Sequence, residues 1–169
     1  PRETAADSLV GAVGQKLETL PDGARIGTSS LRRQSQLLHL LPNCKVLPLR
    51  GNIDTRLRKL DEGEFDAIIV AGAALQRLNI RRGQWLDQKD FVPAPAQGAL
   101  AIQARADDKS TLELFETIND SAAECEISAE RAVVKALNAG CSTPLGARAI
   151  IEENQLQLWA VVLSPDGCK

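Results

Sequence analysis

The sequence predicts an α/β fold followed by a smaller α+β part. Two observations carry this prediction. A strand, a turn and a helix succeed one another three times between residues 24 and 78, which is the order found in α/β domains. After about residue 120 one long helix is followed by two strands. We therefore expect a domain boundary near Asp120.

The first of the three units has a strand at residues 24–27 and a helix within residues 30–41. Its apolar residues recur near helical spacing, and the Pro-Asn pair at 42–43 ends it. Hydroxyl side chains at the junction can cap the helix by accepting a hydrogen bond from a free N–H group. These hydroxyl residues are Thr28, Ser29 and Ser30.

The second and third units follow directly along the chain. A strand at 45–49 leads to a helix that closes at Gly63 and carries one apolar face. Residues 67–71 are continuously apolar, which is typical of a strand buried on both faces, and residues 73–78 are helical.

The later part of the chain is less repetitive. A proline-punctuated loop leads to a predicted strand at 99–103, and an amphipathic helix follows at 110–118. Beyond the boundary we expect a helix at 124–137 and strands at 147–151 and 156–163.

Composition argues against several classes of function. The net charge of −2 and the pI of about 5.5 do not favour a polyanionic partner, and 3% aromatic residues are few for stacking on bases. No apolar run approaches the roughly 20 residues of a membrane span, and residues 1–8 carry no secretory signal core. We expect no nucleic-acid or membrane partner, and a location in the cytoplasm or an organelle stroma.

Cysteine usage argues against a metal site and against disulfides. The four cysteines are far apart, form no C-x-x-C pair and are accompanied by a single histidine. The chain contains no methionine, begins with Pro1 and stops just after a strand-like run, so we expect it to be a fragment.

Arginine is concentrated where strands meet helices. Arg32 and Arg33 fall in the first turn of a helix, where a cation opposes the helix dipole. Arg50 ends the second strand, Arg56 lies one turn into the next helix, and Arg77 follows the third strand. Guanidinium groups bind carboxylates through two parallel hydrogen bonds. The pattern therefore predicts a cationic cleft for a ligand that carries carboxylates.

Two other interpretations stay open at this point. Arginines on the helices of α/β domains are commonly solvated surface residues. Phosphate is a second candidate ligand, although the chain has neither a G-x-x-x-x-G-K-[ST] nor a G-x-G-x-x-G motif.

Five segments together resemble hydroxymethylbilane synthase (porphobilinogen deaminase): GTSSLRRQSQL, LRGNIDTRLRKLDEGEFDAIIVA, AALQRL, PAPAQGALAIQAR and AERAVVKALNAGCSTPLGA. They occur in the order of that family, and the resemblance covers essentially the whole chain. It implies a protein of three domains, two of them periplasmic-binding-protein-like with a mixed sheet. Residues 1–95 resemble the arginine-lined second domain, 96–119 a strand and helix that return to the first domain, and 120–169 the start of the α+β cofactor-cysteine domain.

The resemblance implies a transferase that joins four porphobilinogen molecules head to tail into hydroxymethylbilane with release of ammonia, in heme and chlorophyll biosynthesis. Its primer, a dipyrromethane cofactor, is a thioether on a cysteine that corresponds to Cys141. The implied cofactor-binding residues are Cys141, Thr28, Ser29, Ser30, Arg32, Arg33, Arg56, Gln97 and Gly98. The implied substrate-binding residues are Arg32, Arg33, Arg50, Asn52, Arg56 and Arg77.

The resemblance places the family's catalytic aspartate in the first domain, outside this chain. Asp54 and Asp66 do not match its motif, so we expect no catalytic residue here and no turnover by the fragment alone. The family is expected to be monomeric, whereas the fragment needs the missing segment or another chain. Ala96 stands where a glycine is usual, which should slightly alter the loop. The competing function is a non-catalytic module that binds a carboxylated small molecule.

Overall fold

The computed structural model describes residues 1–140 and 142–168, and its first part is built on a five-stranded sheet in the order β3-β2-β4-β1-β5. β2 is parallel to β3 and β4, whereas β1 runs antiparallel between β4 and β5. The expected α/β fold with a mixed sheet is therefore confirmed. The strands are β1 (Asp7–Gly11), β2 (Arg25–Gly27), β3 (Lys45–Leu47), β4 (Ala67–Ala71) and β5 (Gln84–Trp85).

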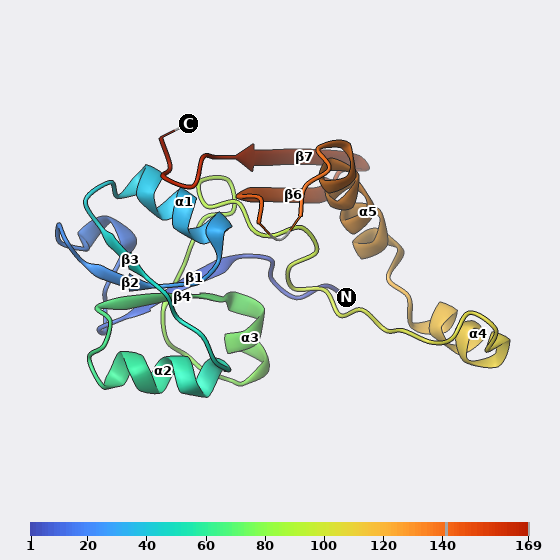
Figure 1. Cartoon of the computed structure of the whole chain (residues 1–169). Coiled ribbons are helices and arrows are strands. Elements are labelled where there is room, and N and C mark those ends of the chain that lie inside the picture. The colour runs from blue at the N-terminus through green and yellow to red at the C-terminus, as the bar shows by residue number, and fades with distance from the viewer. Residues whose placement is uncertain (141, 169) are drawn as a thin grey trace.

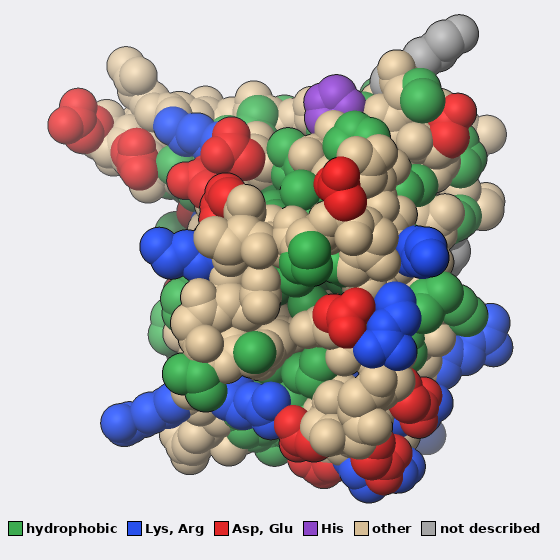
Figure 2. All heavy atoms as spheres, turned by 90° about the vertical axis from the view of Figure 1, so that its left-hand side faces the viewer, with side chains coloured by type: hydrophobic (Ala, Val, Ile, Leu, Met, Phe, Trp, Pro, Cys, Tyr) green, Lys and Arg blue, Asp and Glu red, His purple; other side chains and the backbone are tan. Residues whose placement is uncertain are grey.

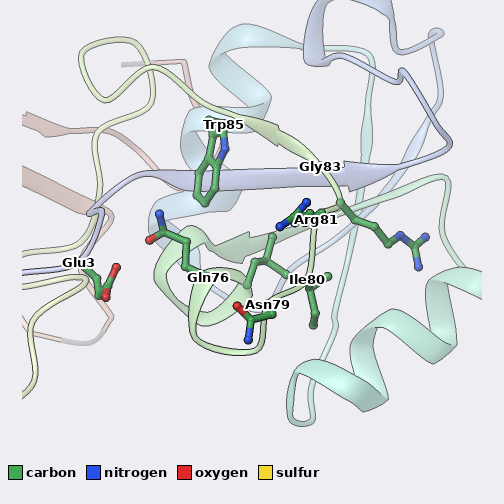
Figure 3. A pocket seen from close by; sticks show the side chains of 9 residues that line it. Glu3, Gln76, Asn79, Ile80, Arg81, Gly83 and Trp85 are labelled. Carbon is green, nitrogen blue, oxygen red and sulfur yellow. The ribbon is translucent and has the colours of Figure 1, made fainter.

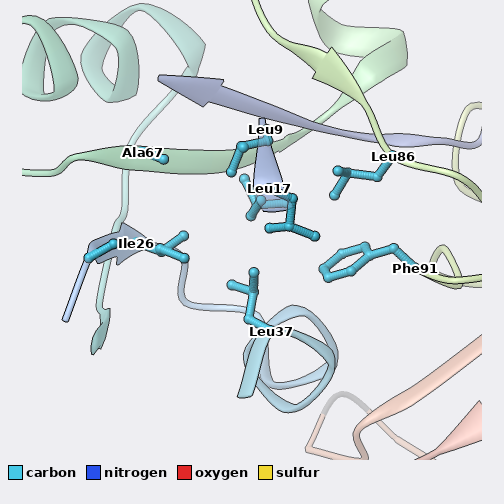
Figure 4. Packing of buried hydrophobic residues seen from close by; sticks show 9 residues of the cluster. Leu9, Leu17, Ile26, Leu37, Ala67, Leu86 and Phe91 are labelled. Carbon is cyan, nitrogen blue, oxygen red and sulfur yellow. The ribbon is translucent and has the colours of Figure 1, made fainter. Parts of the chain in front are cut away.

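Helices cover both faces of this sheet (Figure 1). Helix α1 (Leu31–Leu40) lies on one face, while α2 (Ile53–Asp61) and α3 (Gly72–Arg77) lie on the other. Side chains alternate along β4, so Ala67 and Ile69 join the core under α1 and Ile68 and Val70 join the core under α2 and α3. Leu37 of α1 packs into the first core (Figure 4), which also contains the short 3-10 helix η1 (Leu17–Thr19).

Strand β1 was not predicted. The sequence favoured no element at residues 7–11, because a short strand with an aspartate and a serine has no clear alternation of apolar and polar residues. Its pairing partner β4 begins 60 residues after it, at Ala67, a separation that local patterns do not reveal. All residues from Asp7 to Val10 are buried, so β1 is a central strand of the sheet.

The strand predicted at residues 99–103 is wrong. No regular structure is present there, and Leu100 and Ile102 are 76% and 58% exposed. A strand forms by hydrogen bonding to a neighbour, and within the described residues no strand lies alongside this segment. The helix that follows, α4 (Lys109–Ile118), buries none of its residues and lies away from the sheet (Figure 1).

The last part of the chain is helix α5 (Ser121–Ala136) with an antiparallel hairpin of β6 (Leu145–Glu152) and β7 (Gln155–Val162). This confirms the expected helix and two strands. Asp120 caps α5 by accepting a hydrogen bond from the Ala123 N–H at 2.9 Å. The hairpin contacts the segment that follows β5. Ala147 donates its N–H to the Pro93 carbonyl at 3.0 Å, and Trp159 Nε1 donates to the Gln88 carbonyl at 2.9 Å.

Charges alternate in sign over the face formed by the loops and helix ends at the left of Figure 1. Figure 2 shows Lys and Arg side chains there beside Asp and Glu side chains, without a continuous basic surface. In the part of the chain that the structure describes, no helix is long and apolar enough to cross a membrane.

Candidate functional site

Arg32 and Arg33 lie at the corner where β2 leads into α1, as predicted. The Ser30 side chain caps this helix by accepting a hydrogen bond from the Arg33 N–H at 3.4 Å. Contrary to what is usual for surface arginines, the two residues are only 5% and 9% exposed. The interpretation of this pair as solvated surface residues is therefore wrong.

The carboxylate that compensates the two buried cations is that of Asp7, at the start of β1. Its Oδ1 atom accepts hydrogen bonds from Arg33 Nη2 at 2.7 Å and Arg33 Nε at 3.1 Å. Its Oδ2 atom lies 2.7 Å from Arg32 Nη2. Asp7 is fully buried, and sequence reasoning missed it because the strand that carries it was missed. An acidic residue beside the apolar run Leu9-Val10 was the signal that could have found it.

Backbone carbonyl groups and Gln97 complete the hydrogen bonding of this cluster. Arg32 Nη1 donates to the Val92 carbonyl at 2.7 Å, and Arg33 Nη1 donates to the Ile69 carbonyl at 3.2 Å. Gln97 Nε2 donates to Asp7 Oδ1 at 3.0 Å and to the Ala5 carbonyl at 2.6 Å. The loop that carries Gln97 is therefore attached directly to the arginine pair.

The cluster carries more positive than negative charge. Burial lowers the pKa of the Arg32 guanidinium, nearby Asp7 raises it and Arg33 lowers it. Burial and the charge of Arg33 likewise lower the pKa of Arg56, which places Arg56 in the electrostatic field of the same cluster. Arg56 donates to the Gly51 carbonyl at 2.7 Å and, within the described residues, makes no ion pair. Arg32 and Arg33 thus share one carboxylate, with Arg56 nearby, so the cluster carries a net positive charge.

The predicted hydroxyl and amide residues have structural partners. Ser29 Oγ donates to the Leu49 carbonyl and accepts from the Leu49 N–H, both at 3.0 Å, which joins the β2–α1 corner to the loop between β3 and α2. Thr28 Oγ1 accepts from the Ser30 N–H at 3.2 Å. Asn52 caps α2 by accepting from the Thr55 N–H at 2.9 Å. These contacts hold the two corners side by side.

The other predicted residues lie around this cluster to different degrees. Arg77 Nη2 donates to the Gly98 carbonyl at 2.9 Å, so two predicted residues meet there. Arg50 is exposed on the loop between β3 and α2. Cys141 lies outside the described residues, and the neighbouring Gly140 donates its N–H to Thr143 Oγ1 at 3.1 Å.

A second buried charge network holds the loop before Gln97. Glu130 of α5 is fully buried and forms a bidentate pair with Arg2, at 2.8 and 3.0 Å. Its Oε2 atom also accepts from the Ala96 N–H at 2.6 Å. Arg148 of β6 pairs with Glu126 at 2.8 Å and with Glu130 at 3.3 Å. Sequence reasoning missed this network, because its members are up to 146 positions apart.

The loop itself contains an unfavourable backbone angle. Ala96 has a φ of 64°, a left-handed conformation that glycine adopts without a steric penalty. The expected alteration at this position is therefore a strained angle, which the hydrogen bond to Glu130 helps to hold.

A separate depression of about 500 Å³ lies over α3 and β5, and none of the predicted residues lines it (Figure 3). Trp85 and Arg81 lie along it, with Gln76 and Asn79 opposite. Trp85 packs against Gly72, where an added Cβ would lie 1.9 Å from the indole ring. Gly72 therefore allows the ring to lie flat against the start of α3.

The fold is an α/β domain with a buried arginine pair, joined to a small α+β domain. Residues 1–113 match the family model "Porphobilinogen deaminase, dipyromethane cofactor binding domain", and residues 124–169 match "Porphobilinogen deaminase, C-terminal domain". The chain belongs to the porphobilinogen deaminase family.

Curated relatives support this assignment over nearly the whole chain. The porphobilinogen deaminase of Brevibacillus brevis is 48% identical over 164 residues, which cover 95% of this chain and 53% of that protein. That of Syntrophotalea carbinolica is 44% identical over 169 residues, covering 99% and 54%. The chain thus spans about half the length of the curated relatives it matches.

Solved structures give weaker likenesses, and no argument rests on them. The arginine-specific periplasmic binding protein STM4351 of Salmonella typhimurium has a TM-score of 0.44 at 15% identity, covering 80% of this chain and 56% of that one. The aliphatic sulphonate binding protein SsuA of Escherichia coli has a TM-score of 0.43 at 15% identity, covering 82% and 46%.

Proposed function

We propose that this chain forms the second domain and part of the third domain of an enzyme that joins four porphobilinogen molecules into hydroxymethylbilane with release of ammonia. The observation that carries the proposal is the excess of positive charge formed by the buried Arg32 and Arg33 and the half-buried Arg56, which Asp7 compensates only in part. Membership of the porphobilinogen deaminase family supports the reaction.

The residues present fit a dipyrromethane cofactor. Each pyrrole unit carries an acetate and a propionate, so two linked units bring four carboxylates to the site. Arg32, Arg33 and Arg56 have N–H groups beyond those bonded within the protein, and these can bind carboxylates in pairs. When bound, the cofactor supplies the primer to which pyrrole units are added. The role of this chain is to bind and orient its carboxylates, together with Thr28, Ser29, Ser30, Gln97 and Gly98.

We assign the attachment of this cofactor to Cys141, which follows α5 and precedes β6. Arg50, Asn52 and Arg77, with the arginines of the cluster, would bind the carboxylates of porphobilinogen. The exposure of Arg50 and the position of Arg77 at Gly98 support this division, because side chains that contact an incoming substrate must be reachable from solvent. We assign no catalytic carboxylate to this chain.

We also propose that residues 96–119 pack against a first domain. The apolar side chains that this segment exposes support the proposal, since such side chains are stabilised by burial against another surface. They are Leu100, Ile102, Leu112, Leu114 and Ile118. We place the protein in the cytoplasm or an organelle stroma as a monomer, with porphobilinogen as its small-molecule partner and neither nucleic acid nor membrane as a partner.

The test is to measure the mass of the full-length protein and its colour with Ehrlich's reagent. We expect an adduct of two pyrrole units in the wild type and in Cys125→Ser, a matched control on the exposed face of α5, and no adduct in Cys141→Ser. Hydroxymethylbilane formation from porphobilinogen should follow the same pattern. An unmodified thiol at Cys141 in an otherwise folded protein would instead favour a non-catalytic module that binds a carboxylated small molecule.

A further inference from the structure

We propose that Asp7 is a positioning residue that orients the guanidinium groups of Arg32 and Arg33 toward the anionic ligand. This inference rests on the function proposed above, because it assigns a task to a residue within the same site. Asp7 does not contact the ligand in this proposal, and it acts through the two arginines.

Asp7 and the Ile69 carbonyl fix the orientation of the Arg33 guanidinium. A guanidinium group is planar and rigid, so two fixed N–H groups determine the direction of the other three. Arg33 donates both Nε and Nη2 to Asp7 Oδ1, and its Nη1 to the Ile69 carbonyl. The plane of Arg33 is therefore set by β1 and β4 together, and one N–H on each terminal nitrogen remains for a ligand.

Asp7 contacts Arg32 through its other carboxylate oxygen. Asp7 Oδ2 lies 2.7 Å from Arg32 Nη2, but among the described residues this buried oxygen accepts no hydrogen bond. The contact is a close ion pair, in which Asp7 raises the pKa of Arg32. Asp7 thus neutralises Arg32 and holds it in place, while Arg32 Nη2 also donates to Gln97 Oε1 at 3.5 Å.

Asp7 also offsets the repulsion between the two arginines. Two guanidinium groups that are less than 10% exposed repel each other, and the charge of Arg33 lowers the pKa of Arg32. One buried carboxylate that contacts both cations offsets this repulsion and keeps the arginines adjacent before a ligand is present. Because a single carboxylate cannot neutralise Arg32, Arg33 and Arg56, the cluster still attracts an anion.

Gln97 connects Asp7 to the loop that carries Gln97 and Gly98. Its amide nitrogen donates to Asp7 Oδ1, the oxygen that also binds Arg33. A change in the position of Asp7 would therefore move the arginine pair and the loop at the same time. This makes Asp7 the point that the proposed cofactor-binding elements share.

The test compares Asp7→Asn with Asp66→Asn in the full-length protein. Asp66 also pairs with an arginine, Arg25, at 2.8 Å, but this pair is about two-fifths exposed and lies at the other end of the sheet. Pyrrole content per molecule is measured with Ehrlich's reagent, and kcat is expressed per molecule that carries the adduct. We expect Asp7→Asn to lower this kcat by about tenfold or more, as misplaced binding groups do, and Asp66→Asn to leave it within twofold.

A purely structural role would reduce the yield of folded protein or the fraction that carries the adduct, but not kcat per adduct-bearing molecule. A value for Asp7→Asn within twofold of wild type would therefore overturn the inference. A wild-type protein that carries no pyrrole adduct would overturn the proposed function. The pyrrole content of the wild type is therefore measured before the variants are compared.

A second comparison remains informative where Asp7→Asn alone does not fold. The double variant Asp7→Asn with Arg33→Gln removes one negative and one positive charge, so it leaves fewer uncompensated buried cations than the single Asp7 variant. If Asp7 acts through Arg33, the double variant should have a kcat within threefold of Arg33→Gln alone. A further tenfold loss in the double variant would show that Asp7 acts independently, and the inference would fail.

Discussion

Replacing Glu130 by alanine should strongly destabilise the protein. The substitution leaves Arg2 and Arg148 without their buried partner, although their side chains are only 6% and 11% exposed. Breaking a buried ion pair from one side costs about 3–5 kcal/mol. Two N–H groups, those of Ala96 and Ala149, also lose their acceptor, at about 1–3 kcal/mol each where water does not replace it.

Glu126 offsets part of this loss, because it remains within 3.3 Å of Arg2 and 2.8 Å of Arg148. We therefore expect the free energy of unfolding to fall by at least about 3 kcal/mol, a large part of the roughly 5–15 kcal/mol of a typical protein. The assay is urea unfolding of the full-length protein followed by circular dichroism. Glu62→Gln is the control, since Glu62 pairs with Arg58 on the exposed face of α2 and should change the free energy by less than about 0.5 kcal/mol. A loss below about 1 kcal/mol in Glu130→Ala would refute the assignment of a buried network.

Three further predictions follow from single features. Ala96→Gly should raise the free energy of unfolding by about 0.5–1 kcal/mol, since it removes the left-handed strain of an alanine but adds freedom to the unfolded chain. The control Ala94→Gly lies in the same loop without a positive φ, and it should lower the free energy of unfolding. Hydrogen bonds from Arg25 lower the pKa of Asp66, so this pair stabilises the fold above about pH 4 and its contribution is lost as the pH falls through the folded-state pKa. Acid titration of wild type and Asp66→Asn should show a steeper loss of stability in the wild type, and parallel curves would contradict the assignment. Burial raises the pKa of the Cys44 thiol, so Cys44 should react with iodoacetamide more slowly than the exposed Cys125 and Cys168, as mass spectrometry of the labelled peptides can measure.

The sequence predicted most of the elements that depend on local patterns. The three strand–helix units, the continuous apolar run of β4 and the capping residue Ser30 all lie where local spacing placed them. The arginines at the junctions were found for the same reason. Family resemblance added Gln97 and Gly98, which have no distinctive local pattern.

What the sequence did not predict depends on contacts between distant residues. Asp7 and Arg33 are 26 positions apart, and Arg2 and Glu130 are 128 positions apart, so their pairing becomes visible only in the folded chain. The opposite error arose at residues 99–103, whose short apolar run resembles a strand. That segment has the composition of a strand, but the described chain offers it no neighbouring backbone to pair with.

The loop from Val92 to Gly98 has little freedom in its length. At one end, the Val92 carbonyl is bound by Arg32 and Gln36, and the Pro93 carbonyl by Ala147 of β6. At the other end, Glu130 holds the Ala96 N–H and Arg77 holds the Gly98 carbonyl. A residue inserted or deleted between these points would break contacts to the sheet or to α5. This stretch therefore works as a fixed-length spacer that sets how far the α+β domain stands from the arginine cluster.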